Sequence, residues 1–219
     1  MQRLRDECVT NFGIKAEVIV KDLADPAAPR QIYDELTGKS IAVDILVNNA
    51  GFASHGPFAN SDLDNELNIV HVNVMTLMQL TRLFLPAMIE RRAGRILNVA
   101  STAAYVPGPY MSTYYASKAF VLSHSVALAR ELRRTGVTVT ALCPGPTHTG
   151  FQVRAKMTAS NLFRVGAMSS MRVAEIAYAA MMKGKTIAIA GIHNRLGAIM
   201  SRLVPYTLSA SIAGKLNGD

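Results

Sequence analysis

The chain has 219 residues, of which 50% are hydrophobic and 17% are charged, and its formal net charge is +8. This length is enough for one α/β domain with a substantial buried core, and this composition excludes global disorder. The basic residues are spread along the chain without a nucleic-acid motif, so we expect no nucleic-acid partner. No uninterrupted apolar run reaches the roughly 18 residues that a membrane span requires.

Two kinds of segment alternate along the chain. The first residues, MQRLRDECVT, have the pattern of a helix. Aliphatic runs that predict buried parallel strands occupy residues 16–20, 44–47, 95–99, 137–142 and 186–190. Amphipathic segments that predict helices occupy residues 26–36, 62–91, 112–134 and 173–183, with a bend or a new cap expected at Pro86. This alternation predicts right-handed βαβ crossovers and a doubly wound parallel sheet in a single domain, residues 1–219.

The first two predicted strands are each followed by candidate ligand contacts, at the edge of the sheet where doubly wound folds bind ligands. Asp22 and Leu23 follow the first strand, and the Asp22 carboxylate could accept from an adenine amino group or cap the next helix. The second strand is followed by Asn48, Asn49, Ala50 and Gly51. Small residues there let a cofactor approach the backbone, and asparagine side chains can lock a turn.

Four polar side chains further along could carry chemistry. Asn73 lies inside the predicted helix 62–91, where it could fill a kink and present its carbonyl to water, or be satisfied at a helix contact. Ser101 lies just beyond the strand at 95–99, where a hydroxyl can donate to a developing oxyanion. Tyr114 and Lys118 are four residues apart and share one face of a helix. An ammonium near a phenol favours the phenolate, so this pair could exchange a proton with a carbonyl or alcohol oxygen, unless it is a surface pair.

A proline-glycine turn ends the strand at 137–142. Its backbone and hydroxyl groups could meet a carboxamide and a phosphate, and the residues concerned are Pro144, Gly145, Thr147 and Thr149. Residues 150–170 are apolar with interspersed basic residues, so we expect either a lid over a hydrophobic ketone or alcohol, or simple packing.

The C-terminal stretch, residues 193–216, has a basic and aliphatic helical pattern. It could cap the domain, pack on a second subunit, or lie on a membrane surface. Cys8 and Cys143 lack metal-ligand spacing, which predicts free thiols in a reducing compartment and no metal site.

Together these motifs resemble the short-chain dehydrogenase/reductase family. The pattern N-N-A-G after a strand, an asparagine inside the next helix, a serine thirteen residues before Y-x-x-x-K, and P-G-x-x-x-T after a later strand occur in the family's order over nearly the whole chain. The resemblance implies a Rossmann-type fold. It also implies hydride transfer, with NADP or NAD, to or from a ketone or secondary alcohol that is hydrophobic or acyl-linked. The basic net charge leans toward NADP.

The same resemblance implies roles for the candidate residues. Tyr114 would be the proton donor or acceptor, Lys118 would hold the nicotinamide ribose and lower the tyrosine pKa, Ser101 would orient the substrate oxygen, and Asn73 would hold a relay water. Residues 22–23 would contact adenine and residues 48–51 the adenosine side, whereas residues 144–149 would contact the nicotinamide and its phosphate. A homo-oligomer, dimer or tetramer, built on residues 62–91 and 112–134 is also implied. We expect a cytoplasmic protein in which residues 193–216 offer a peripheral membrane contact.

One departure from the family pattern concerns the phosphate-binding turn. The family begins with a strand and a T-G-x-x-x-G-x-G turn, whose backbone N–H groups bind the pyrophosphate. No such glycine pattern precedes Asn48. The resemblance therefore implies a sheet that lacks its first two strands and first helix, which would bare a flank of the 44–47 strand. The alternative function is that of an inactive remnant that only binds partners or oligomerises.

Overall fold

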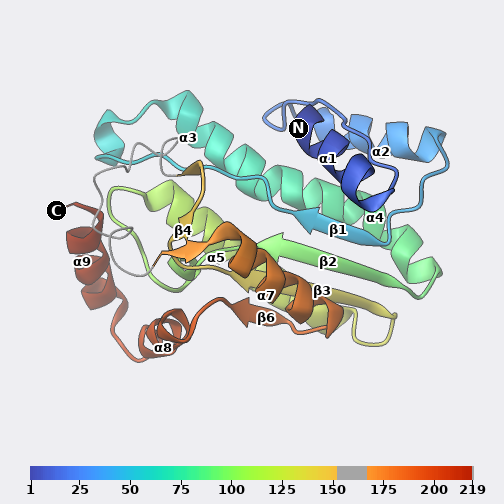
Figure 1. Cartoon of the computed structure of the whole chain (residues 1–219). Coiled ribbons are helices and arrows are strands. Elements are labelled where there is room, and N and C mark those ends of the chain that lie inside the picture. Colours follow the sequence, from blue (N-terminus) through green and yellow to red (C-terminus); the bar gives the residue numbers. More distant parts are fainter. Residues whose placement is uncertain (152–166, 219) are drawn as a thin grey trace.

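Four parallel strands form the central sheet of the computed structural model, which describes residues 1–151 and 167–218 (Figure 1). The strands follow the spatial order β1-β2-β3-β6. Their bounds are β1 (Ile45–Asn48), β2 (Gly94–Val99), β3 (Val137–Cys143) and β6 (Ile187–Ile189). Asn48 pairs with Asn98, and Val99 with Leu142, so the carboxyl ends of the strands meet at one edge. Each strand lies in an aliphatic run that was predicted to form one.

Helices cover both faces of this sheet, as Figure 1 shows. The three that pack on it are α4 (Leu77–Glu90), α5 (Ser112–Glu131) and α7 (Ser170–Met182). Successive side chains of β2 point to opposite faces. Ile96 belongs to a core cluster with Met88 of α4 and Leu128 of α5, whereas Leu97 belongs to another with Val173 of α7. The predicted doubly wound, Rossmann-type fold is therefore confirmed.

A single long helix runs from Leu63 to Glu90 and consists of α3 (Leu63–Val70), the π-helical turn η2 (His71–Thr76) and α4. A bend or a new cap was expected at Pro86, and of these two the new cap does not form, because the helix continues through this proline. Pro86 and Arg82 both lie on the exposed face, so the Arg82 carbonyl that loses its intrahelical partner faces solvent. Among the described residues, this is the one helix long and apolar enough to cross a membrane. It is also the helix that packs Phe84 and Met88 into the core.

The remaining elements lie around this framework. They are α1 (Gln2–Phe12), α2 (Ala28–Gly38), η1 (Phe58–Asn60), η3 (Thr102–Tyr105), β4 (Thr147–His148), β5 (Met168–Ser169), α8 (Ile192–Met200) and α9 (Tyr206–Asn217). Helix α9 is tied to the main body by Asn217, which donates to the Pro109 carbonyl at 2.9 Å and accepts from the Tyr115 hydroxyl at 3.3 Å. The basic C-terminal stretch thus forms two helices that follow the last strand.

Residues 16–20 are not a strand in the structure, so that prediction is wrong. A strand needs a hydrogen-bonded neighbour, and no described strand lies beyond β1 to supply one. Val20 is 81% exposed, and the segment is held instead by the ion pair of Glu17 with Lys39 at 2.7 Å. The outer strand β1 leaves Ile45 and Val47 exposed.

Candidate active site

A pocket of about 780 Å³ lies at the carboxyl edge of the sheet. Asn49 and Gly51 reach it from the end of β1, Ser101 from the end of β2, and residues 144–147 from the end of β3. Helix α5 adds Tyr114 and Lys118 from the opposite side. Residues that are far apart in the sequence therefore converge where the strand ends meet, as expected for a doubly wound sheet.

Tyr114 and Ser101 form the polar centre of this pocket. The Ser101 hydroxyl lies beside the phenol, where it acts to lower the pKa of Tyr114, and Ser101 accepts from the Ala103 N–H at 3.1 Å, which caps η3. The centroid of the Tyr114 ring lies 5.3 Å from that of the Phe151 ring and 6.0 Å from that of the Tyr115 ring. Burial by these neighbours raises the pKa of Tyr114 to about 12, although Ser101 acts in the opposite direction. The phenol is therefore protonated at neutral pH.

Lys118 is buried beneath the same pocket. Its Nζ donates to the Val99 carbonyl at 2.8 Å and lies 5.7 Å from the centroid of the Tyr114 ring. Burial lowers the pKa of Lys118 to about 8. In this structure burial of the phenol outweighs any lowering of the Tyr114 pKa by Lys118, since the ammonium is directed to the backbone of β2. Lys118 instead places a cation under the pocket floor.

Asn73 holds the loop after β1 in place from inside the π-helical turn η2. Its side chain accepts from the Phe52 N–H at 3.1 Å, donates to the Phe52 carbonyl at 3.0 Å, and donates to the Ser117 hydroxyl at 3.0 Å. A Cβ atom on Gly51 would lie 2.9 Å from Asn73 Oδ1 and 3.4 Å from Lys118 Nζ. This loop therefore requires a glycine at position 51. Asn73 sets the distance between the loop and α5, because it bonds to both.

Several candidate residues do not reach the pocket. The Asn48 side chain turns into the core, where it donates to Asn98 at 2.8 Å and to Thr81 at 3.1 Å. Asp22 accepts from the Ala24 N–H at 2.9 Å, which closes a turn before α2 rather than capping that helix. The Leu23 carbonyl accepts from Thr76 at 2.9 Å. These three residues, with Ala50 and Asn73, are not among the described residues that line the pocket.

The turn after β3 packs closely against a residue that the sequence did not single out. A Cβ atom on Gly145 would lie 2.4 Å from the amide of Asn194, which itself donates to the Ala190 carbonyl at 2.6 Å. Thr147 donates to the Gly145 carbonyl at 2.9 Å, and Thr149 accepts from the Phe151 N–H at 3.2 Å. No local sequence pattern marks Asn194, because its partner turn lies about fifty residues earlier.

The substrate side of the pocket is described in part. Met111, Tyr115, Phe151, Val173 and Met181 line it and make it mainly apolar. Most of the expected lid, residues 150–170, lies outside the described residues. A half-buried phenol, a hydroxyl beside it and a buried cation below them can protonate an oxygen and stabilise the charge that results.

Comparisons with known proteins identify a family. The family model described as short chain dehydrogenase matches residues 1–161. The ketoacyl reductase HetN of Nostoc sp. is 35% identical over 74% of this chain and 56% of its own length. A very-long-chain 3-oxoacyl-CoA reductase of Anas platyrhynchos is 33% identical over 66% of this chain and 47% of its own length. The chain thus spans about half the length of these curated relatives.

Solved structures show the same fold. A short-chain dehydrogenase from Sphingobium yanoikuyae, in complex with NADPH, has a TM-score of 0.81 and 26% sequence identity, over 92% of this chain and 79% of that chain. A 7beta-hydroxysteroid dehydrogenase has a TM-score of 0.84 at 20% identity, over 97% of this chain and 81% of that chain. At such identity the second likeness concerns the fold alone.

Proposed function

This chain belongs to the short-chain dehydrogenase/reductase family, a family of oxidoreductases, and from that premise we propose that it reduces a hydrophobic, acyl-linked ketone with NADP(H) or NAD(H). The observation that carries the proposal is that Ser101 and Tyr114 line one pocket above the buried Lys118, at the carboxyl edge of the sheet. Ketoacyl reductases among the similar proteins support the substrate class.

The residues at the ends of β1 and β3 fit a flat, extended cofactor. Gly51 and Gly145 both lie where a Cβ atom would collide with a neighbouring amide, so each keeps the backbone open to the pocket. Asn49 and Thr147 line the pocket beside these glycines. The NADPH complex of a similar dehydrogenase supports NADP(H) as the first cofactor to test. When bound, the cofactor supplies a hydride to the substrate carbon.

The proton comes from the protein's own side chains. With its pKa at about 12, Tyr114 carries its proton at neutral pH and can give it to the substrate oxygen. The Ser101 hydroxyl, which lines the same pocket, can then donate to the same oxygen or to the phenolate. The Lys118 ammonium stabilises the phenolate through space, because a cation favours a nearby anion. This protonation state favours the reductive direction.

Self-association is the second part of the proposal. Helix α3 exposes Leu63 and Leu67, and helix α5 exposes Phe120, so these two helices carry apolar surface away from the sheet. Exposed apolar patches of this kind commonly mark protein contacts. If α3 and α5 form the contact between two copies of the chain, light scattering should give the mass of an oligomer for the parent chain. The Leu67→Asp variant should then have the mass of a monomer.

The experiment that tests the catalytic proposal measures cofactor binding and oxidation together. NADPH and NADH are titrated against the full chain by fluorescence, and consumption of the cofactor is then followed with a 3-oxoacyl thioester. Tyr114→Phe should lower kcat by about 100- to 10,000-fold, because the proton donor is lost. Its binding of NADPH should persist, because Phe retains the ring that packs on Phe151.

Tyr33→Phe is the matched control, since Tyr33 packs on Phe84 far from the pocket and its loss should leave kcat unchanged. Binding of neither cofactor would refute the proposal and favour a protein that only binds partners. Equal rates for Tyr114→Phe and Tyr33→Phe would refute the role of Tyr114.

A further inference from the structure

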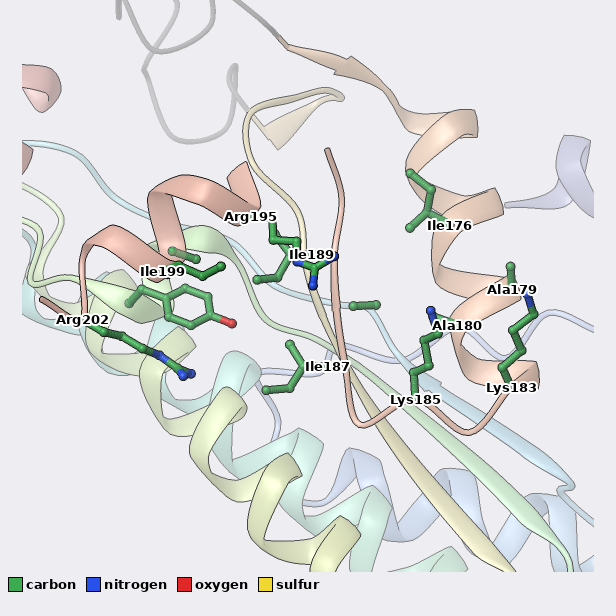
Figure 2. Close-up of a pocket in the computed structure, with 13 residues that line it drawn as sticks. Ile176, Ala179, Ala180, Lys183, Lys185, Ile187, Ile189, Arg195, Ile199 and Arg202 are labelled. Atoms are coloured by element: carbon green, nitrogen blue, oxygen red, sulfur yellow. The ribbon is translucent and has the colours of Figure 1, made fainter. Parts of the chain in front are cut away.

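A second pocket, of about 600 Å³, lies at the β6 edge of the sheet (Figure 2). Helix α7 separates it from the candidate active site. Ala177 and Met181 face the active-site pocket, whereas Ile176 and Ala180 face the second one. The described linings of the two pockets share no residue. The second pocket is therefore a distinct cavity, and the proposed catalytic chemistry does not use it.

Aliphatic side chains form the body of this pocket. Ile187 and Ile189 come from β6, which is the outermost strand on this side of the described sheet, and Ile199 comes from α8. Tyr105 of η3 also lines the pocket, and its hydroxyl donates to the buried Cys143 thiol at 3.7 Å. Burial and the neighbouring thiol raise the pKa of Tyr105 above its ordinary range, so its ring stays neutral. An apolar chain is the ligand that such walls accommodate.

Four cationic side chains line the same pocket, and no acidic residue does so among those described. Lys183 and Lys185 lie at the end of α7 and the start of β6, whereas Arg195 and Arg202 come from α8 and its end (Figure 2). None of the four belongs to an ion pair within the described part of the chain. The Arg202 guanidinium lies 5.6 Å from the centroid of the Tyr105 ring. Four unneutralised like charges around one cavity create a positive potential that attracts an anion.

We propose that this pocket binds an anionic amphiphile, namely an aliphatic chain that ends in a phosphate or a carboxylate. The isoleucine side chains would cover the aliphatic chain, and Arg195 and Arg202 would hold the head group, because a guanidinium can bind either anion through two hydrogen bonds. The described lining offers apolar contacts for the chain and cationic contacts for the head group in one cavity.

A second copy of this chain is a poorer occupant on grounds of charge. It would have to bring acidic side chains to four cations, yet the chain has 15 acidic residues against 23 lysines and arginines. Like charges placed together across an interface oppose association. A flat bilayer surface would meet the exposed cations but would leave a concave, aliphatic pocket unfilled.

Calorimetric titration of the full chain tests the proposal. The probes are dodecyl phosphate below its micelle concentration, inorganic phosphate and dodecanol. Dodecyl phosphate should bind with one-to-one stoichiometry and about tenfold more tightly than either half alone, and each methylene removed from its chain should weaken binding by about fourfold. Saturating NADPH should leave this binding unchanged, since the two pockets are separate.

Variants locate the bound probe. The double change Arg195→Gln and Arg202→Gln should weaken binding of dodecyl phosphate by about tenfold or more, because the head group loses its charged partners. Lys215→Gln is the matched control, since Lys215 is an exposed cation of α9 outside the pocket and its loss should have no effect. Circular dichroism checks that both variants keep the fold.

Three outcomes overturn the proposal. The first is equal affinity of the double variant and the control. The second is displacement of dodecyl phosphate by NADPH, which would place the amphiphile in the active-site pocket. The third is binding only to vesicles that contain phosphatidylglycerol, with no binding of monomeric dodecyl phosphate, which would indicate a membrane surface instead.

Discussion

Lys118 is expected to destabilise the folded chain at neutral pH, because its ammonium is charged and buried. Replacing it with methionine should reveal the free-energy cost of burying this charge. Burial lowers the pKa of Lys118 from 10.5 to about 8. Each pKa unit corresponds to about 1.4 kcal/mol, so carrying the charge costs the folded chain about 3 kcal/mol. Lys118→Met removes that cost but also removes the hydrogen bond to the Val99 carbonyl, which is worth about 1 kcal/mol. The variant should therefore be more stable than the parent by about 2 kcal/mol at pH 7.

This gain should disappear as the pH rises. Below pH 8 the lysine is protonated in both states, and the folded chain bears the full cost of the buried charge. Between pH 8 and 10.5 the unfolded chain holds more protons than the folded one, so the parent gains stability with pH relative to the variant. Above pH 10.5 both states are neutral, and the methionine variant should be the less stable by about 1 kcal/mol, the lost hydrogen bond.

Urea unfolding followed by circular dichroism measures both effects. The quantity to compare is the difference in free energy of unfolding between parent and variant, because ionisation of Tyr114 and Cys143 then largely cancels. Lys215→Met is the control, since this lysine is exposed and its replacement should give a difference that does not vary with pH. A Lys118→Met variant that is less stable at pH 7, or a difference that is flat with pH, would refute the reasoning.

Four further predictions concern stability, and urea unfolding measures each. Asn73→Ala should cost about 2 to 3 kcal/mol, because Phe52 and Ser117 lose partners inside the protein; an unchanged midpoint would contradict this. Asn48→Ala should lower the free energy of unfolding by about 2 kcal/mol, because its hydrogen bonds to Asn98 and Thr81 are lost. Its affinity for NADPH, measured by fluorescence, should not change. A loss of NADPH affinity without a loss of stability would show that Asn48 binds the cofactor. Gly136→Ala should cost at least about 2 kcal/mol, because its φ is +83° and the new Cβ would lie 2.0 Å from the Arg92 carbonyl oxygen. Gly197→Ala, in an open part of α8, should stabilise by about 0.5 to 1 kcal/mol, and similar effects of the two glycine changes would contradict the geometric argument.

The expected pH dependence of unfolding also indicates why proposed function and stability conflict at this site. A charge under the pocket floor is useful to a phenol that must lose a proton, yet the same burial makes the charge costly. Lys118 therefore contributes to the proposed chemistry but lowers the free energy of unfolding of the chain. The methionine variant separates the two, since it should gain stability at pH 7 while losing activity.

The sequence by itself predicted the features that depend on local spacing. Aliphatic runs indicated the four strands of the sheet, and polar or small residues at the strand ends indicated the edge where the pocket lies. Tyr114 and Lys118 could be paired in advance because four residues in a helix bring side chains to one face. The run at residues 16–20 had the same local pattern but is not a strand, since pairing needs a neighbour that a local pattern cannot supply.

Only the tertiary structure decided which candidates reach the pocket and how they are charged. Asn48 and Gly51 are three residues apart, yet one side chain enters the core and the other position borders the pocket. Asn194 was not found because its contact with Gly145 joins residues about fifty positions apart and depends on where α8 packs after β6. The pKa values of Tyr114 and Lys118 move in the directions set by burial, and burial is the sum of neighbours from α5, β2 and the loops around them. Local spacing determined the pair, whereas the packing around it determined that the phenol keeps its proton and the ammonium loses its own more readily.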